Sequence, residues 1–371
     1  MNRLSVCFLL SRFEAGGLER VQMYIAAGLV NKGIETRVVT RLIDAQAGAL
    51  LRPDVSMHVL GGSRLGFMYR LYRWLRNVEP GVIITSANDI GCFSVLLRRI
   101  FWPESKIIWT QHLSISGPLR RSVGIKRLRL LLEIWLMRLL VKHADAVVAV
   151  SRSVADDMKK TISPGLHVRV IYNPVISGDF EQRSRESIDW PWPDRAVPTI
   201  VFAGRLASIK RVDLLLQAFS LCLQSMPARL LVVGDGPEAG MARGLARKLR
   251  LGQACEFVGY RDNSLPWICR ANLLVLCSDS EGFGLVLVEA MGCGTQVVAT
   301  DCPDGPSEVL EDGRYGRLVP MDNANALADA IQASLLSPLV PKDELKKRAA
   351  EFCVERAVAQ YLDLWNIVVE G

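Results

Sequence analysis

One pattern limits what this chain can fold into: short apolar runs alternate with amphipathic helical stretches, and the alternation starts again in the second half. The first series begins at Leu4–Leu10 and the second begins at Thr199–Ala203. Alternation of this kind is typical of parallel βαβ units. A length of 371 residues also exceeds one ordinary hydrophobic core. The sequence therefore predicts an α/β protein with two Rossmann-like domains that face a central cleft.

The expected strands and helices divide the chain into three parts. In the first series we expect strands at 4–10, 35–41, 82–86, 106–110, 146–151 and 168–172, with a helix at 18–31. In the second we expect strands at 199–203, 229–233, 256–258, 273–277, 296–300 and 316–319, with helices at 212–224 and 238–249. The polar segment 183–198 holds three prolines and has the composition of an interdomain linker. We accordingly assign 1–182 to a first domain, 199–352 to a second, and 353–371 to a C-terminal helix.

Charge is spread unevenly along the chain. Residues 1–190 hold 27 Lys and Arg against 16 Asp and Glu, whereas residues 191–371 hold 18 against 22. Halves of opposite sign indicate two domains with different partners. A basic half suits nucleic acid or an anionic membrane. Because no basic run carries the interleaved aromatic residues of RNA-binding segments, we expect no nucleic-acid partner and favour the membrane.

Two basic segments in the first half are the candidates for membrane contact. Residues 64–76 place Met68, Leu71, Tyr72 and Leu75 on one helical stripe, with arginines away from it. Residues 117–142 carry seven cations and a single acid, Glu133. Such segments either dock on anionic lipid, at about 1 kcal/mol per cation, or pack on a sheet with a solvated basic face. Two of them in one half favour docking on the membrane surface.

Cysteine usage and the apolar runs indicate the compartment. Nine cysteines are scattered singly without any Cys-x-x-Cys pair, which favours buried, reduced thiols and no metal-binding spacing. Arg12 and Glu14 interrupt the first apolar run, so it is expected to be a buried strand and not a signal peptide. No stretch of about 18 uncharged apolar residues predicts a transmembrane helix. We therefore expect a cytoplasmic protein, peripheral on the inner face of the cell membrane.

Two carboxylates eight residues apart, Glu281 and Glu289, are the most informative motif of the second half. Between them a glycine-containing turn leads into an apolar stretch that is expected to be helical. The N-terminus of a helix presents unpaired N–H groups and about half a positive charge, so it suits a phosphate. Glu281 lies at the mouth of the turn, and Glu289 is expected about two turns into the helix. The layout fits a nucleotide-sugar, which has hydroxyls at both ends and a diphosphate between them.

Two cations follow the first strand of the second series. Arg205 comes after the glycine that ends this strand, and Lys210 lies five residues further on. A guanidinium binds phosphate oxygens in bidentate fashion, and an ammonium adds a movable point charge. Taken alone, such a pair is a common surface feature. At a strand end, with the two glutamates downstream, it predicts a diphosphate site.

The first half offers its own turn between a strand and a helix. Gly16 and Gly17 allow close approach of an anion to the backbone, although a plain βα turn also uses glycine. His112 follows the strand at 106–110, a position that favours a role in the site over a structural one. In the second half, the loop Asp301–Glu308 has two prolines and a glycine and is either a wall of the cleft or a structural turn.

Together these motifs resemble those of the retaining glycosyltransferases of family four, which have the GT-B fold. The resemblance covers nearly the whole chain and is strongest from Val201 to about Ala330. It implies that Glu289 holds the ribose hydroxyls, that Glu281 is catalytic and holds sugar hydroxyls, and that His112 lies near the transferred sugar. It places the donor phosphates against the following residues: Arg205, Lys210, Phe283, Gly284, Leu285, Gly16 and Gly17.

The resemblance also implies an activity. A sugar moves from a nucleotide-sugar, UDP-linked or alternatively GDP-mannose, to a glycan or lipid-linked glycan in lipopolysaccharide, O-antigen or capsule synthesis. The first domain faces the acceptor, the second holds the donor, and the C-terminal helix crosses back to the first. No Asp-x-Asp triplet occurs in the chain. Since that motif commonly holds a metal against a nucleotide-sugar, we expect neither metal nor cofactor.

Three rival classes stay open at this stage. A GT-B sugar-nucleotide epimerase would share the fold and the nucleotide site but would consume the donor without an acceptor. A dehydrogenase is disfavoured, because no Gly-x-Gly-x-x-Gly follows either first strand. A binding protein without catalysis would not need the cation pair and the glutamate pair together.

Overall fold

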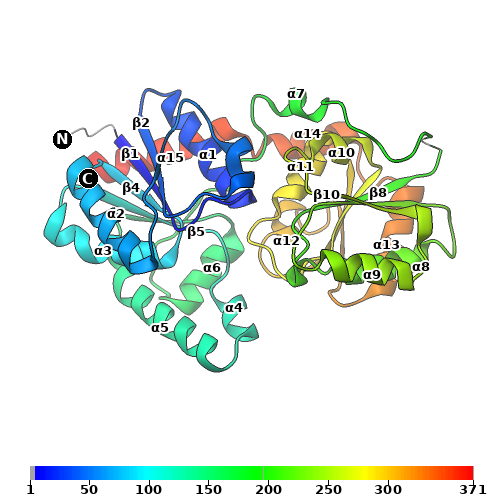
Figure 1. Ribbon diagram of the computed structural model, residues 1–371, viewed down its shortest axis with the longest axis horizontal. Coiled ribbons are helices and arrows are strands. Elements are labelled where there is room, and N and C mark those ends of the chain that lie inside the picture. The colour runs from blue at the N-terminus through cyan, green and yellow to red at the C-terminus, as the bar shows by residue number, and fades with distance from the viewer. Residues whose placement is uncertain (1–4, 195, 371) are drawn as a thin grey trace. The chain divides into compact units, whose positions relative to one another are not determined.

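The computed structural model describes residues 5–194 and 196–370. The chain forms two compact units (Figure 1). One unit takes the chain up to Pro174 and again from Val354 onward, and the other takes Val175–Cys353. The proline-containing segment 183–198 lies within the second unit, because the chain leaves the first unit already after Pro174.

A parallel sheet of seven strands forms the centre of the first unit. Its order is β3-β2-β1-β4-β5-β6-β7. All six residues of β1 are buried, which explains their continuous apolar run: the strand is paired on both edges and covered on both faces. The strands are β1 (Ser5–Leu10), β2 (Glu35–Thr40), β3 (Ser56–Val59), β4 (Val82–Thr85), β5 (Lys106–Gln111), β6 (Ala146–Ala149) and β7 (Arg169–Val170).

Helices cover this sheet on both sides (Figure 1). The C-terminal helix packs beside the first helix, α1, and α3 packs beside α5. Gly28 of α1 lets the two helices approach closely, since a Cβ there would lie 2.4 Å from a methyl carbon of Val358. The helices are α1 (Gly17–Val30), α2 (Arg64–Val78), α3 (Asn88–Phe101), α4 (Ser116–Arg121), α5 (Gly124–Leu140), α6 (Arg152–Thr161) and α15 (Val354–Glu370), with 3₁₀ turns at Ala45–Leu50 and Val141–His143.

The two basic helices of this unit differ in what they expose. On α2 the apolar stripe faces inward, with Leu71 and Leu75 fully buried. This helix is therefore packed on its own sheet with a solvated basic face, and its stripe is not a free docking surface. On α5 apolar side chains are exposed, among them Leu128 at 67% and Trp135 at 54%. Of the helices in the described part of the chain, none combines the length and apolarity needed to cross a bilayer.

The second unit contains a parallel sheet of six strands in the order β10-β9-β8-β11-β12-β13. The strands are β8 (Thr199–Ala203), β9 (Arg229–Val233), β10 (Cys255–Gly259), β11 (Leu273–Leu276), β12 (Gln296–Thr300) and β13 (Arg317–Val319). As in the first unit, the first strand, β8, lies next to both its successor β9 and the later strand β11. In both sheets the strand order therefore reverses at the first strand, with the second strand on one side of it and a later strand on the other.

Helices form a layer on each face of the second sheet. The buried core on one face joins β8, β9 and β11 to α8, α9 and α13, while α10, α11 and α14 pack together on the other (Figure 1). The helices are α7 (Phe180–Ser184), α8 (Val212–Cys222), α9 (Ala239–Lys248), α10 (Leu265–Arg270), α11 (Leu285–Cys293), α12 (Pro306–Val309), α13 (Ala324–Leu336) and α14 (Lys342–Ala350), with 3₁₀ turns at Ser208–Lys210 and Gly252–Ala254.

One expectation about the cysteines is wrong. Cys269 of α10 and Cys293 of α11 form a disulfide, whereas the other seven cysteines are free. The two positions are 24 residues apart, so no short motif marks them. The packing of α10 against α11 brings them together.

The first and last segments of the second unit are joined by main-chain hydrogen bonds. The amides of Val175 and Ile176 both donate to the carbonyl of Phe352, at 2.8 and 3.1 Å. Ile176 also pairs with Cys353 as a parallel bridge. The chain therefore enters and leaves this unit at one place, and α15 then belongs to the first unit.

Candidate functional site

Lys210 and Glu281, predicted from separate motifs, meet in the second unit. The Lys210 ammonium forms an ion pair with the Glu281 carboxylate, and both side chains are largely buried, at 25% and 12% exposed. The Ser278 hydroxyl donates to the same carboxylate oxygen at 2.6 Å. Lys210 lies in the loop after β8, and Glu281 lies in the loop after β11. The pair therefore sits at the carboxyl ends of adjacent parallel strands, where ligands bind in open α/β sheets.

The helix after Glu281 begins directly after the glycine-containing turn. Gly284, at φ 85°, adopts the left-handed conformation, so α11 starts only at Leu285. Glu289 consequently lies in the second turn, nearer to the helix start than expected, and is 3% exposed. No side chain caps the start of α11. Its first N–H groups are therefore suited to an anion.

The Arg205 loop is held by the loop that follows β9. The amide of Leu206 donates to the carbonyl of Asp235 at 2.9 Å, and the amide of Gly204 donates to that of Val233 at 3.0 Å. Gly234 makes this packing possible, because a Cβ there would lie 1.9 Å from the Gly204 carbonyl oxygen. Arg205 is exposed on the loop so fixed. Gly234 was not among the predicted site residues, although a glycine directly after a strand is a signal for close backbone approach.

The loop 301–308 lies against the Glu281 loop. The amide of Glu281 donates to the carbonyl of Pro303 at 3.3 Å. Pro306 then begins the short helix α12. The predicted wall segment and the carboxylate loop are thus neighbours through the backbone.

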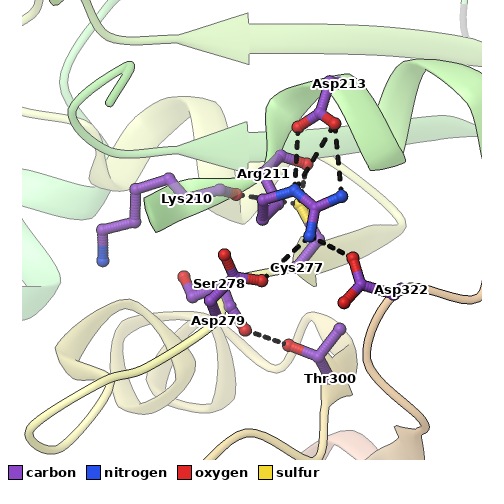
Figure 2. Close-up of polar contacts among 8 residues, drawn as sticks. All are labelled: Lys210, Arg211, Asp213, Cys277, Ser278, Asp279, Thr300 and Asp322. Carbon is purple, nitrogen blue, oxygen red and sulfur yellow. Dashed lines mark hydrogen bonds and ion pairs between the residues drawn. The ribbon is translucent and has the colours of Figure 1, made fainter. Parts of the chain in front are cut away.

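Arg211 is the centre of an ion-pair cluster beside Lys210 (Figure 2). Its guanidinium binds Asp213 from two nitrogens, Asp279 at 3.0 Å, and Asp322. Hydrogen bonds donated to Asp322 and then to Asp213 raise the pKa of this guanidinium above its usual range. The three carboxylates come from α8 and from the loops after β11 and β13. Arg211 therefore ties together the segments that carry Lys210 and Glu281, and the sequence analysis did not single it out.

A buried thiol also holds the backbone that carries Lys210 and Arg211. The Cys277 Sγ donates to the carbonyls of Lys210 and Arg211, at 3.1 Å each (Figure 2). Burial raises the pKa of Cys277 to about 12, so the side chain keeps its proton and remains a donor. The Thr300 hydroxyl donates to the carbonyl of Ser278 at 2.7 Å. These bonds fix the backbone on both sides of the Lys210–Glu281 pair.

In the first unit, Gly16 and Gly17 form the start of α1. Gly16 is the N-cap and Gly17 the first helical residue. The Glu19 carboxylate folds back over this turn, because a Cβ at Gly16 would lie 2.5 Å from its Oε2. Burial raises the pKa of Glu19 above its ordinary value, against the opposing effect of backbone hydrogen bonds. The glycine turn is thus already lined by a carboxyl group of its own helix.

His112 lies just after β5 and contacts α1. The Gln22 amide nitrogen lies 3.1 Å from the imidazole Nε2. Burial lowers the pKa of His112 to about 3, so the ring is neutral at physiological pH. With the amide as donor, Nε2 accepts and the proton resides on Nδ1. The neighbouring Gln111 side chain donates instead to the carbonyl of Leu113, at 2.7 Å.

The described residues form no cluster of metal-binding side chains. Within residues 5–194 and 196–370, no three His, Cys, Asp or Glu side chains are gathered so that they could hold a metal ion. The acids nearest to Lys210 are paired with cations or hydroxyls, as described above.

Both halves of the chain match families of known proteins. The family described as "Glycosyltransferase Family 4" matches residues 15–177, and that described as "Glycosyl transferases group 1" matches residues 197–337. This chain belongs to glycosyltransferase family 4. The family assignment agrees with the motif resemblance. The first matched region contains β2 to β7, and the second contains β8 to β13.

Relatives with named roles fall into several pathways. The N-acetyl-α-D-glucosaminyl L-malate synthase of Bacillus anthracis is 28% identical, over 63% of this chain and 62% of its own length. The amylovoran biosynthesis glycosyltransferase AmsD of Erwinia amylovora is 25% identical over 96% of each chain. A Campylobacter jejuni enzyme named as an N-acetylgalactosaminyltransferase acting on a diphospho-undecaprenol-linked sugar is 26% identical, over 70% of this chain and 69% of its own length.

Solved structures share the fold at low sequence identity. The sucrose-phosphate synthase of Thermosynechococcus elongatus superposes with a TM-score of 0.80 at 21% identity, covering 98% of both chains. The Anabaena protein HepE in complex with UDP superposes with a TM-score of 0.76 at 19% identity, covering 97% of this chain and 98% of that one. The GT-B fold expected from the sequence is confirmed.

Proposed function

We propose that this glycosyltransferase transfers a sugar from a nucleotide-sugar, with UDP as the nucleotide, to a lipid-linked glycan of envelope polysaccharide synthesis. The observation that carries the proposal is the Lys210–Glu281 pair, placed at strand ends before the uncapped start of α11. An ammonium has three N–H donors, so Lys210 can keep Glu281 and still donate to a phosphate oxygen. UDP is favoured because HepE was solved with UDP.

The chemistry needs no protein base. In the retaining reaction proposed here, the bond from the sugar anomeric carbon to the diphosphate oxygen breaks. A bond from the same carbon to the acceptor oxygen forms on the same face. The proton of the acceptor hydroxyl passes to a phosphate oxygen of the leaving group. Arg205, Lys210 and the N–H groups of α11 stabilise the negative charge on the diphosphate, while Glu281 and Glu289 orient hydroxyl groups.

The activity test measures release of UDP from UDP-hexoses and UDP-N-acetylhexosamines, with GDP-mannose as the competing donor. We expect release that depends on an acceptor, survives EDTA, and gives a product with the anomeric configuration of the donor by NMR. Loss of activity in EDTA with rescue by Mn²⁺ would contradict the metal-free site. Epimer formed from donor alone would instead identify a sugar-nucleotide epimerase.

A second experiment substitutes single residues of the proposed donor site. Arg205→Ala, Lys210→Ala and Glu281→Ala should each lower the transfer rate by about 10²–10³-fold, which is the cost of removing one oxyanion-hole donor. Arg314→Ala is the control, because Arg314 pairs with Glu311 on the exposed surface of the same unit. A variant of the three that keeps near-normal turnover removes that residue from the proposed site.

The partner surface that we propose for an anionic membrane is the outer face of α5. Its exposed apolar side chains recur every three or four residues, as expected for one face of a helix: Ile125, Leu128, Leu132, Trp135 and Leu139. Exposed Arg127 and Arg129 flank this stripe. An apolar stripe bordered by cations matches the acyl and anionic headgroup layers of a bilayer surface.

Vesicle cosedimentation tests this surface. The wild-type protein should pellet with phosphatidylglycerol vesicles and much less with phosphatidylcholine vesicles. Leu128→Ser combined with Trp135→Ser should abolish pelleting, whereas Leu336→Ser, at a 75% exposed leucine of the second unit, should not. Equal pelleting of the double variant and the wild type would refute the docking surface.

A further inference from the structure

One fully buried amide of the first unit contacts the ring of His112. Gln22 lies in the second turn of α1 and is 0% exposed. Its amide nitrogen lies 3.1 Å from the imidazole Nε2 of His112, which is 90 residues further along the chain. The buried residues around Gln22 on α1 are mainly apolar, among them Ile25 and Ala26. A polar side chain in such surroundings is costly unless its hydrogen bonds are made, so its presence here requires an explanation.

The oxygen of the same amide adds to that cost. Gln22 Oε1 is buried and has no hydrogen-bond partner in the described part of the chain. A buried acceptor left unpaired lowers stability, and a methionine of similar length would avoid the loss. In the second unit, Gln296 instead uses both ends of its amide, which bonds the carbonyl of Val340 and the amides of Leu339 and Val340. Gln296 therefore stabilises the fold, whereas the bond that Gln22 makes is to a single ring.

The loop that carries His112 is held by other bonds. The Asp157 carboxylate on α6 accepts from the amides of Ile115 and Ser116, at 2.5 and 3.1 Å. These bonds fix the backbone just after His112 and do not involve Gln22. Removal of the Gln22 amide should therefore release the imidazole ring while the loop stays in place.

The contact with Gln22 also determines which ring nitrogen of His112 carries the proton. In the neutral ring, with the amide nitrogen as donor, Nε2 accepts and the proton lies on Nδ1. Within the described residues Nδ1 has no hydrogen-bond partner, and it is not among the fully buried polar atoms that lack one. His112 is itself partly exposed. The ring therefore offers an accessible N–H donor at Nδ1.

We propose that Gln22 is a positioning residue for His112: it holds the imidazole ring in the orientation and tautomer in which Nδ1–H donates to a hydroxyl oxygen of the transferred sugar. The inference rests on the proposed transferase function, in which His112 lies near that sugar. Gln22 acts through the ring and does not itself contact the substrate. A neutral N–H donor suits an uncharged hydroxyl group and leaves the diphosphate to the cations of the second unit.

Nitrogen NMR of the full chain tests the tautomer without any substrate. The chain has four histidines, and the His112 signals are identified by their loss in His112→Ala. In mildly alkaline buffer we expect the wild type to show a protonated Nδ1 and an unprotonated Nε2. Gln22→Met has no N–H donor and should show a mixture of both tautomers. A protonated Nε2 in the wild type, or an unchanged tautomer in Gln22→Met, would overturn the proposal.

Transfer rates test what the orientation of the ring contributes. Gln22→Met should lower kcat roughly 10–100-fold, since a misplaced group costs up to about 10²-fold. In a chain that already carries His112→Ala, the same substitution should leave kcat almost unchanged, because Gln22 acts only through the ring. An equal loss in both backgrounds, or an unchanged kcat in Gln22→Met alone, would refute the positioning role.

Thermal unfolding separates positioning from folding. Gln22→Met should unfold close to the wild type, because the lost hydrogen bond is offset by removal of an unpaired buried oxygen. Gln22→Leu provides a second variant without an N–H donor, for which the same results are expected. Gln296→Met is the matched control: it removes the bonds of a buried amide to three main-chain atoms. It should lower the thermal transition, while kcat measured well below that transition stays near the wild-type value. Destabilisation of both Gln22 variants to the extent of Gln296→Met would show that Gln22 is structural.

Failure of this inference differs from failure of the proposed function. A wild-type protein that releases no nucleoside diphosphate from any donor would refute the transferase, whereas the tautomer of His112 is measured without substrate. An active wild-type protein whose rate does not depend on Gln22 would refute the positioning role alone.

Discussion

At the residue scale, the predicted donor residues contact each other in an arrangement that the sequence does not specify. Lys210 was assigned to a phosphate and Glu281 to a sugar, yet the two form an ion pair. Ser278 adds a hydroxyl donor to Glu281. A carboxylate held by a cation and a hydroxyl is fixed in orientation before a ligand arrives, which favours precise placement of a sugar hydroxyl.

The half-buried His112 predicts a pH-dependent stability. Its pKa is about 3 in the folded protein, lowered by burial, against 6.5 for the free side chain. Below pH 6.5 the unfolded chain binds a proton that the folded chain does not, so stability falls as pH drops toward 3. The slope from this group approaches about 1.4 kcal/mol per pH unit. In His112→Gln this contribution should be absent.

Denaturant unfolding at pH 8, 7, 6, 5 and 4, followed by circular dichroism, measures the effect. Between pH 7 and 8 the difference between wild type and His112→Gln should be constant, because the histidine is neutral in both states. Below pH 6 the difference should shrink steadily. Parallel stability curves over the whole range would show that His112 is not buried as a neutral ring.

At the element scale, the sequence predicted every strand of the described residues except β3, including all those that are completely buried. β1 and β8 were identified because they are buried on both faces and read as continuous apolar runs. β3 was missed, since it lies at the sheet edge and is exposed at both of its ends. The expected turn before the helix is present, and α11 begins at Leu285 directly after the left-handed Gly284.

The remaining site residues depend on topology and not on local pattern. Lys210 and Glu281 follow two different strands, and only the strand order brings them together. The same holds for Arg211, whose three carboxylate partners lie in separate segments. Local motifs identify residues that lie on one loop, whereas clusters built from several loops require the sheet to be known.

Arg211 should therefore matter more than an ordinary surface cation. Arg211→Ala leaves Asp213, Asp279 and Asp322 close together without their shared cation (Figure 2). We expect the free energy of unfolding of the second unit to fall by about 1–3 kcal/mol, the cost of leaving charged acceptors unpaired. Transfer activity should fall as well, because Lys210 is the preceding residue. Calorimetry and steady-state rates measure the two effects.

Arg211→Lys and Arg314→Ala are the matched comparisons. The lysine variant keeps the charge and should recover part of both losses. Arg314→Ala breaks an exposed pair with Glu311, and such pairs contribute about 0–1 kcal/mol. If Arg211→Ala were as mild as Arg314→Ala, the cluster would not be holding these loops.

At the scale of the whole molecule, the first unit is completed by the last helix of the chain. Buried side chains of α15, including Tyr361, Leu364 and Trp365, belong to the core of this unit. Burial of each large apolar side chain contributes about 1.5–3 kcal/mol. The contact between α1 and α15 is therefore a substantial part of the stability of the first unit.

Gly28→Ala tests that contact. The added methyl would lie 2.4 Å from Val358 Cγ2, so α15 must shift. Overpacking of this kind costs about 1–3 kcal/mol, and the better helix propensity of alanine offsets about 1 kcal/mol. We expect a net loss of about 0–2 kcal/mol in the first unit, measured as a lowered thermal transition by calorimetry.

Two further variants test whether the clash with Val358 causes the loss of stability in Gly28→Ala. Gly48→Ala adds a methyl with no atom within 4 Å and should change stability by less than about 0.5 kcal/mol. Gly28→Ala combined with Val358→Ala should cost less than the sum of the single changes, because the second substitution removes the clash. Strict additivity would show that the two helices do not touch at this point.

The return of the chain to its first unit has a consequence for biosynthesis. A ribosome that has finished residue 174 must still translate the whole of 175–353 before α15 emerges. At about 5–20 residues per second this takes roughly 9–36 s. During that interval the nascent first unit exposes the apolar side of α1, and at its end the second unit has every residue it needs while α15 is still to be made. The later-made half is thus expected to mature first on the ribosome, and the earlier-made half to rely on chaperones until synthesis ends.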